Sequence, residues 1–213
     1  MPVAVLSVKP KTLNRRIKPV VFLLLAGPLI WLAWQWYLTL TVGNSALGFQ
    51  PIEATNRFTG DWAFYYLMLG LALTPLSKIF KTPLPVAFRR MVGLYAFTLA
   101  ALHISHYIAV DQYFNWPVIW DDIVKRPFIT IGMISFLLLL PLALTSTKKM
   151  VKRLGAKRWQ KLHKLVYLIV PLVLVHYWMM LRGQRLEPWL WMSLIIFLLL
   201  FRVNWKKLKA KAA

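Results

Sequence analysis

Six long apolar segments, separated by shorter polar or basic ones, constrain this chain more than any other feature. They cover residues 19–42, 61–76, 91–110, 127–145, 159–181 and 188–203. About 20 apolar residues suffice for a helix to cross the hydrocarbon core of a bilayer. The chain is 59% hydrophobic, whereas soluble domains are about 45–50% apolar. The sequence therefore predicts an all-α membrane protein, a bundle of six transmembrane helices.

Basic residues are distributed unevenly among the connections. The chain has 27 Lys and Arg residues against 6 Asp and Glu, a formal net charge of +21. The Lys and Arg residues concentrate in residues 1–18, in the connections after the second and fourth apolar segments, and in residues 204–213. Because basic loops stay on the cytoplasmic side, we expect a cytoplasmic basic N-terminal segment (1–18), one transmembrane domain (19–203) and a cytoplasmic basic tail (204–213). Clusters between apolar runs favour membrane lipid, and not nucleic acid, as the partner.

Four histidines lie in the third and fifth apolar segments, at His103, His106, His163 and His176. An ionisable side chain inside a spanning helix is costly and marks a candidate functional site. At ~1.5 Å per residue, His103 lies roughly 12 Å and His176 roughly 9 Å below the outer ends of their helices. Two imidazoles at similar depth are what a bis-histidine haem requires, although two hydrogen-bonded core histidines would give the same pattern. Arg182 and Arg185, just above, are candidate partners for haem propionates.

The other two histidines each have more than one candidate role. His163 lies near the expected cytoplasmic face, where it suits an inner cofactor or a simple interfacial residue. The position opposite it, thirteen residues before His103, is Arg90, so the inner site lacks a second histidine. Thirteen residues leave His163 and His176 about 140° apart on an ideal helix, so the two need a kink at Pro171 or a local rewinding to face one neighbour. His106 is an alternative ligand, a propionate or quinone hydrogen-bond donor, or a packing residue.

Four motifs carry a resemblance to a known family: RRMVGLY (89–95), ALHISHY (101–107), WQKLHKLVY (159–167) and VHYW (175–178). With the six spans, they resemble the MsrQ (YedZ) family of haem-binding membrane subunits, within the ferric-reductase-like transmembrane superfamily. The resemblance covers nearly the whole chain. It implies one or two b-type haems at His103, His163 and His176, and an FMN that no motif places.

The resemblance also implies a location and a pathway. The location is the bacterial inner membrane. Electrons would pass from the quinone pool, or from a cytoplasmic flavin reductase, to the periplasmic molybdopterin subunit MsrP, which repairs methionine sulfoxide in oxidised periplasmic proteins. The chain would then be the electron-transfer subunit of an oxidoreductase system, and whether it is itself an enzyme stays open.

Two departures and two rival functions accompany this interpretation. Compared with the wider ferric reductase and NADPH oxidase group, the chain has Arg90 in place of a fourth haem histidine, and we expect no C-terminal FAD/NAD(P)H domain. A stand-alone membrane ferric or quinone reductase is the first rival. A non-redox transporter or scaffold is the second, and it is disfavoured because the spans show no broken-helix repeats with carboxylates at the midplane.

Overall fold

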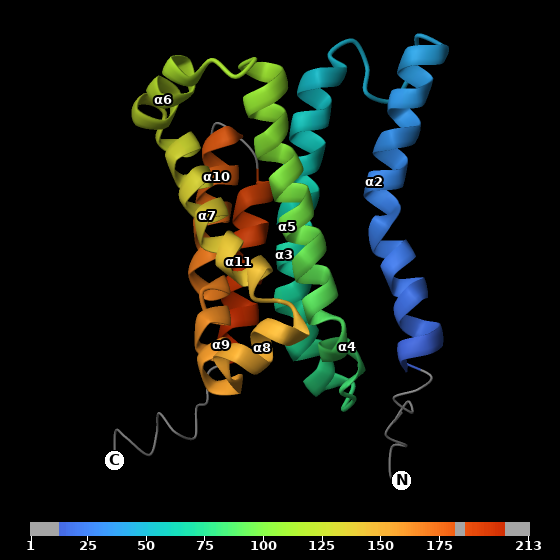
Figure 1. Cartoon of the computed structure of the whole chain (residues 1–213), viewed down its shortest axis with the longest axis vertical. Helices are drawn as coiled ribbons and strands as arrows, with labels where there is room; N and C mark the ends of the chain where they lie inside the picture. Colours follow the sequence, from blue (N-terminus) through green and yellow to red (C-terminus); the bar gives the residue numbers. More distant parts are fainter. Residues whose placement is uncertain (1–12, 182–185, 203–213) are drawn as a thin grey trace.

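The computed structural model describes residues 13–181 and 186–202, and over that part the chain is helical with no strand. Six longer helices run along one axis and stand side by side, with α2 at one edge (Figure 1). They are α2 (Lys18–Thr41), α3 (Pro51–Ile79), α5 (Arg89–His106), α7 (Pro127–Leu144), α10 (Val166–Met180) and α11 (Glu187–Leu200). The shorter elements are η1 (Leu13–Ile17), α4 (Leu84–Ala87), η2 (Tyr107–Asp111), α6 (Trp116–Lys125), α8 (Lys148–Leu154) and α9 (Ala156–His163), η denoting a π-helix. The prediction of an all-α protein is confirmed.

Four helical segments are long and apolar enough to cross a membrane: Arg15–Val42, Arg89–Asp111, Pro127–Leu144 and Ala156–Met180. Helix α3 is longer than any of these but carries Glu53, Arg57 and Asp61 in its first half. Helix α11 is apolar but has only 14 residues. The chain is therefore a multi-pass membrane protein, and the count of six spans stays a prediction.

The second long helix starts earlier than the apolar pattern predicts. Helix α3 begins at Pro51 rather than near residue 61, with proline in its first turn and Glu53 close behind. Both are favoured at a helix start, because proline needs no amide partner there and a carboxylate complements the positive helix end. Thr59, near the expected start, lies inside α3 and donates its hydroxyl to the carbonyl oxygens of Thr55 and Asn56.

The fifth apolar segment is broken between its two histidines. Helix α9 ends at His163 and α10 begins at Val166. Around the break, the amides of residues 164, 165, 167 and 168 donate three residues back, at 2.9–3.2 Å. Such tight turns rotate the chain by ~120° per residue instead of ~100°, so four of them reduce the ideal separation of ~140° to roughly 60°. The rewinding needed to bring both histidines toward one neighbour is present, and it lies before Pro171.

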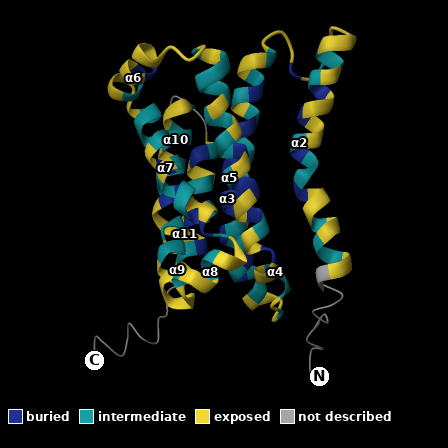
Figure 2. Cartoon of the chain, in the orientation of Figure 1, coloured by how far each residue is buried: buried dark blue, intermediate teal, exposed yellow. Residues whose placement is uncertain are grey.

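The helix bundle buries its core mainly along α3, α5 and α10. Phe64, Leu71, Leu99 and Ile169 are each at most 1% exposed. Figure 2 shows buried positions along α3 and α5, with exposed positions over much of the outer surface. Many of the exposed side chains are large and apolar, among them Leu24, Leu40 and Leu190. An apolar surface of this extent requires a lipid or protein environment.

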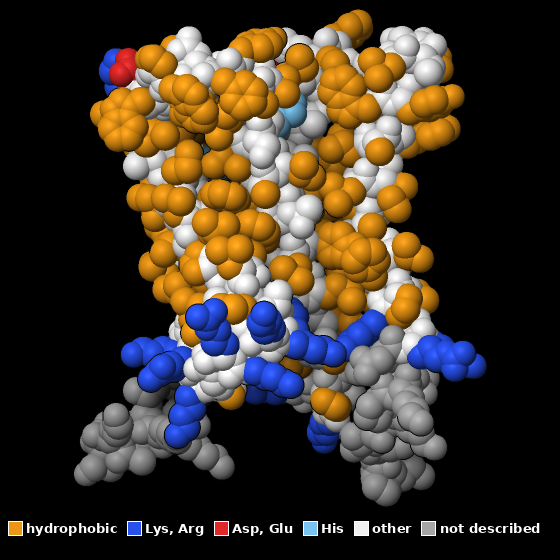
Figure 3. Space-filling view, viewed as in Figure 1, with side chains coloured by type: hydrophobic (Ala, Val, Ile, Leu, Met, Phe, Trp, Pro, Cys, Tyr) orange, Lys and Arg blue, Asp and Glu red, His pale blue; other side chains and the backbone are white. Residues whose placement is uncertain are grey.

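The two ends of the bundle differ in charge. Lys and Arg side chains gather in one band around α8 and α9 (Figure 3), which we call the basic end. The opposite, aromatic end carries α6 and the exposed side chains of Phe49, Tyr113, Phe114, Trp116 and Trp120. All six acidic residues lie on the half of the bundle nearer this end: Glu53 and Asp61 early in α3, Asp111 in η2, Asp121 and Asp122 in α6, and Glu187 at the start of α11. This asymmetry is typical of a protein with a fixed orientation in the membrane.

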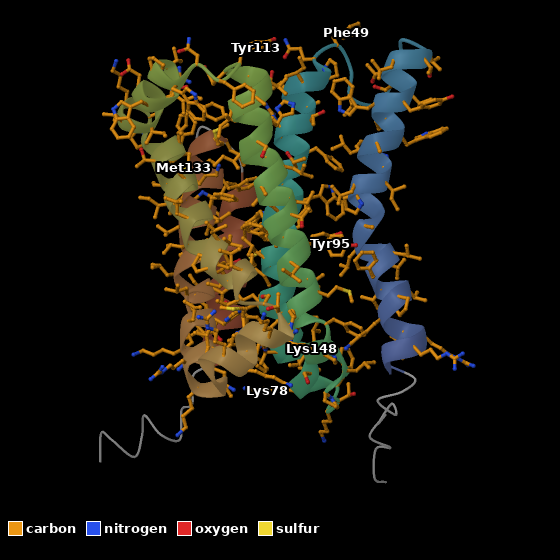
Figure 4. All side chains as sticks on the ribbon, viewed as in Figure 1. Phe49, Lys78, Tyr95, Tyr113, Met133 and Lys148 are labelled. Carbon is orange, nitrogen blue, oxygen red and sulfur yellow. The ribbon has the colours of Figure 1, made fainter. Side chains whose placement is uncertain are left out.

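Helix α2 is attached to the bundle by side chains that bind its backbone. The hydroxyl of Tyr66 in α3 donates to the carbonyl oxygen of Leu25 at 2.6 Å. The hydroxyl of Tyr95 in α5 donates to that of Phe22 at 2.9 Å, and Figure 4 shows Tyr95 directed toward α2. Two neighbouring helices thus hold α2 through hydrogen bonds to its main chain.

Candidate functional site

His103 of α5 and His176 of α10 meet inside the bundle, on the side of its midpoint nearer the aromatic end. Their ring centroids lie 6.3 Å apart, and the ring planes are inclined by 75°. The similar depths of His103 and His176, counted along their helices from the sequence, predict that the two side chains lie close together. An imidazole–metal bond is roughly 2 Å long, so two imidazoles on opposite sides of one metal have centres roughly 6 Å apart. The spacing of the pair fits such a metal.

Each imidazole of the pair is held by a backbone carbonyl group of a neighbouring helix. Nδ1 of His103 lies 2.9 Å from the carbonyl oxygen of Asn56 in α3. Nδ1 of His176 lies 2.7 Å from that of Phe128 in α7. Because a carbonyl oxygen can only accept, Nδ1 must carry the proton in both rings, and Nε2 keeps its lone pair. This is the tautomer and the support that metal-binding histidines have.

A glycine lies four residues after each of those carbonyl groups. In an α-helix the residue at i+4 stands directly above carbonyl i, so its side chain would fill the space that the imidazole occupies. A Cβ atom on Gly60 would lie 3.1 Å from Nδ1 and Cε1 of His103. A Cβ atom on Gly132 would lie 2.9 Å from the same atoms of His176. The same arrangement of carbonyl, glycine and histidine therefore occurs twice, in α3–α5 and in α7–α10.

Asp111 supports the first of these arrangements from the aromatic end. Its carboxylate accepts a hydrogen bond of 2.6 Å from the side-chain amide of Asn56, whose carbonyl holds His103. Asp111 ends the π-helix η2, which directly follows α5. Its other oxygen lies 3.6 Å from Nδ1 of His106, which is too far for a hydrogen bond. Within the described residues, Nδ1 of His106 is buried without a hydrogen-bond partner, so no carbonyl group fixes its tautomer.

His163 lies toward the basic end and has its own carbonyl support. Its Nδ1 is 3.0 Å from the carbonyl oxygen of Trp159, and its ring stacks on that indole at 3.9 Å. In the described part of the chain, its Nε2 is buried with no hydrogen-bond partner. Arg90 acts on His163 electrostatically, so the two lie near each other as the sequence predicts. A guanidinium group has no lone pair to give a metal, so Arg90 cannot replace the absent histidine. Arg182 and Arg185 lie outside the described residues.

The pair of His103 and His176 suits a metal that brings most of its own ligands. Among the residues that the structure describes, no group of three or more His, Cys, Asp or Glu side chains gathers where a metal ion could bind. Two neighbouring imidazoles with no third protein ligand among the described residues suit a haem, whose macrocycle would supply the remaining nitrogens. The donor set and its geometry thus fit haem.

Fold and site together define the class of protein. It is a ferric-reductase-like membrane protein, since the family described as "Ferric reductase like transmembrane component" matches residues 59–175. That stretch includes His103, His163 and both glycines, and it ends one residue before His176.

The chain is also similar to individual proteins over most of its length. The chain is 45% identical to the "Protein-methionine-sulfoxide reductase heme-binding subunit MsrQ" of Caulobacter vibrioides, over 86% of this chain and 84% of that one. It is 46% identical to the protein of the same name from Herminiimonas arsenicoxydans, over 79% and 78% of the two chains. The chain belongs to the MsrQ family. It is also 39% identical to the magnetosome protein MamZ of Paramagnetospirillum magneticum, over 88% of this chain but only 29% of that longer protein.

Proposed function

We propose that this chain is the haem-binding membrane subunit of a methionine sulfoxide reductase system. It would carry electrons outward across the bacterial inner membrane to the periplasmic molybdopterin subunit MsrP and so support repair of oxidised periplasmic proteins. The relatives' names support the haem and the reductase. The band of Lys and Arg at one end supports the direction, because basic loops stay cytoplasmic. In this orientation both termini are cytoplasmic and all six longer helices span the membrane.

One observation carries this proposal: the doubled arrangement of carbonyl, glycine and histidine around His103 and His176. In it, the carbonyl groups of Asn56 and Phe128 keep the proton on Nδ1 and leave Nε2 free to bind a metal. His103 and His176 would hold haem b, which would supply a one-electron carrier. The histidines hold and orient it, and the carbonyl groups keep both imidazoles neutral donors at a depth where water is scarce.

The remaining candidate residues and cofactors are assigned supporting roles. His163 offers a supported, unpaired Nε2 for a second haem, but Arg90 is no ligand, so one or two haems remain compatible with the site. Arg182 is proposed as a propionate partner of the haem at His103 and His176. His106 is proposed as a packing residue, because no carbonyl group orients it. The electron donor is proposed to be the quinone pool or a cytoplasmic flavin reductase, and FMN is retained without a site.

A second candidate function is supported by the family match itself. The family is described by ferric reduction, so a stand-alone membrane ferric or quinone reductase would use the same histidine pair. The two functions differ in the final electron acceptor. Addition of purified MsrP to the reduced protein should oxidise its haem rapidly if the first function is right, whereas a ferric chelate or a quinone should do so if the second is right.

The experiment that tests the haem assignment is a dithionite-reduced minus oxidised spectrum with haem-per-protein stoichiometry. It should be recorded for the wild type and the variants His103→Ala, His176→Ala and His106→Ala. We expect each of the first two variants to lose the haem at this site, and His106→Ala to retain the wild-type spectrum. Full haem content in both His103→Ala and His176→Ala would overturn the assignment.

A further inference from the structure

Two arginines meet at the basic end of the bundle. Arg89 is the first residue of α5, and Arg202 follows the end of α11. The Nη1 of Arg202 donates to the hydroxyl of Tyr167 at 2.6 Å, and its guanidinium carbon lies 5.2 Å from the centre of that ring. Its Nη2 donates to the carbonyl oxygen of Leu71 in α3. Arg202 is thus held by two other helices, α3 and α10.

Pro75 explains why a carbonyl acceptor is available inside α3. Proline has no amide proton, so the carbonyl group four residues earlier, that of Leu71, has no intrahelical partner. Leu71 lies eight residues before the end of α3, roughly 12 Å from the basic end, and it is only 1% exposed. The guanidinium group of Arg202 therefore reaches between the helices from the basic end, and the side chain as a whole is half-buried.

Arg89 brings a second positive charge to the same place. Its Nη2 donates to the hydroxyl of Thr74, three residues after Leu71 on α3. The charges of Arg89 and Arg202 repel each other. In the described part of the chain, Nε of Arg202 is buried and has no hydrogen-bond partner. Arg89 is exposed and Arg202 is half-buried, so the two guanidinium groups meet at the edge of the bundle, where one buried donor is still unused.

No acidic side chain of the protein can neutralise this pair. The chain has six Asp and Glu residues, and all of them are described and lie on the half nearer the aromatic end. Two like charges held close together, with no acidic side chain near them, create a local positive potential that attracts an anion. The arginine pair therefore favours an anion from outside these side chains. Lys78, which donates to the carbonyl oxygen of Phe201 at 3.3 Å, adds a further positive charge close by (Figure 4).

We propose that Arg89 and Arg202 form a binding site for an oxyanion group, a carboxylate or a phosphate, at the basic end of the bundle. Guanidinium groups bind both anions through paired N–H donors. Tyr167 and Thr74 position the two side chains. Tyr167 follows His163 by four residues, so the oxyanion site adjoins the inner histidine. Two sources supply this chemistry: the propionates of a tetrapyrrole held at His163, and the phosphate of an anionic lipid.

Purified full-length protein provides the test. The wild type and the variants Arg89→Gln, Arg202→Gln and Lys148→Gln should be placed in nanodiscs of phosphatidylcholine, with or without phosphatidylglycerol. In a second arm, the same proteins should be reconstituted with haem b or with its dimethyl ester, which has no free carboxylate. The measured quantity is the midpoint of thermal unfolding. Lys148 is the control, since it is an exposed lysine of the basic end and its loss removes the same charge.

We expect one anion source to raise the wild-type midpoint above that of its uncharged counterpart. A rise with phosphatidylglycerol identifies a phosphate as the ligand, and a rise with haem b over its ester identifies a carboxylate. Either rise should fall by more than half in Arg89→Gln and Arg202→Gln and persist in Lys148→Gln. The proposal is overturned if neither source raises the midpoint, or if the arginine variants respond as Lys148→Gln does.

Two features keep the test decisive. Arg89→Gln removes a side chain whose described hydrogen bond is to Thr74 alone, so it remains informative if Arg202→Gln fails to fold. The lipid arm needs no haem, so failure of the haem assignment at His103 and His176 would not be mistaken for failure of the oxyanion site.

Discussion

Gly132 touches the imidazole of His176: a Cβ atom at this glycine would lie 2.9 Å from Nδ1 of the ring, closer than real side chains approach. At Gly60 the corresponding distance to His103 is 3.1 Å, so both rings depend on the absence of a side chain from the facing helix. The two glycines are therefore part of the histidine site, although neither could bind a metal.

The glycine contacts give the first prediction. We expect Gly132→Ala to weaken haem binding by about 10–100-fold, the usual effect of disturbing the groups that orient a ligand. Gly60→Ala should weaken haem binding less, because the ring of His103 must move less than that of His176 to make room for a Cβ atom. Haem titration of the purified apoprotein measures both. Gly93→Ala in α5 is the control, as a Cβ atom there meets nothing within 4 Å, and unchanged binding in Gly132→Ala would contradict the prediction.

Asp111 gives the second prediction. Its removal in Asp111→Ala leaves the side-chain amide of Asn56 without its acceptor, so α3, which holds His103 through the Asn56 carbonyl group, loses a bond to the segment that directly follows α5. We expect haem affinity to fall by about tenfold, less than in His103→Ala, with a shifted Soret maximum. Asp121→Ala, which removes an exposed ion pair with Lys125, is the matched control. Equal haem affinities in the two variants would show that the bond to Asn56 does not matter.

His163 gives the third prediction. If its unpaired Nε2 holds a second haem, His163→Ala should lose one haem equivalent and keep the spectrum of the pair at His103 and His176. Haem-per-protein stoichiometry and the redox titration of both proteins measure this. A wild type with one haem, unchanged in the variant, would assign the inner histidine to another role.

The attachment of α2 gives the fourth prediction. Tyr66→Phe and Tyr95→Phe each remove a hydroxyl that donates to the α2 backbone. Interhelical hydrogen bonds in membrane proteins contribute about 0.6 kcal/mol on average, with a maximum near 1.7. We expect the double variant to lose about 1–3 kcal/mol of unfolding free energy, measured by denaturation in mixed micelles. Tyr113→Phe, at an exposed position of the aromatic end, should change little; a larger loss there would contradict the assignment.

The sequence predicts the meeting of His103 and His176 because depth along two helices follows from residue counting alone. It does not predict their anchors. A backbone carbonyl carries no residue identity, so Asn56 and Phe128 could be found only once the neighbours of α5 and α10 were known. Gly60 and Gly132 gave a weak signal, since a glycine within a helix often marks a close approach but does not say to what.

The helix limits, like the histidine site, could be predicted from the sequence only in part. Pro51 and Glu53 are ordinary start signals for α3. They lie before the apolar run, in a stretch that contains charged residues, so a prediction based on apolar runs starts the helix too late. The rewinding between His163 and His176 was required by the angle between them, yet its position could not be deduced, because proline and a tight turn relieve the same strain. The pairing of Arg202 with the Leu71 carbonyl joins residues 131 positions apart, and no local pattern reports it.

The use of main-chain acceptors has an evolutionary consequence. Because His176 is held by a carbonyl group, which every residue type provides, substitution at position 128 can leave this anchor in place. Position 132 has no such freedom, since a Cβ atom there would lie 2.9 Å from the ring of His176. In natural variants of this protein, selection should therefore preserve the glycine at position 132, which contributes no atom to the hydrogen bond, and tolerate change at position 128, which does.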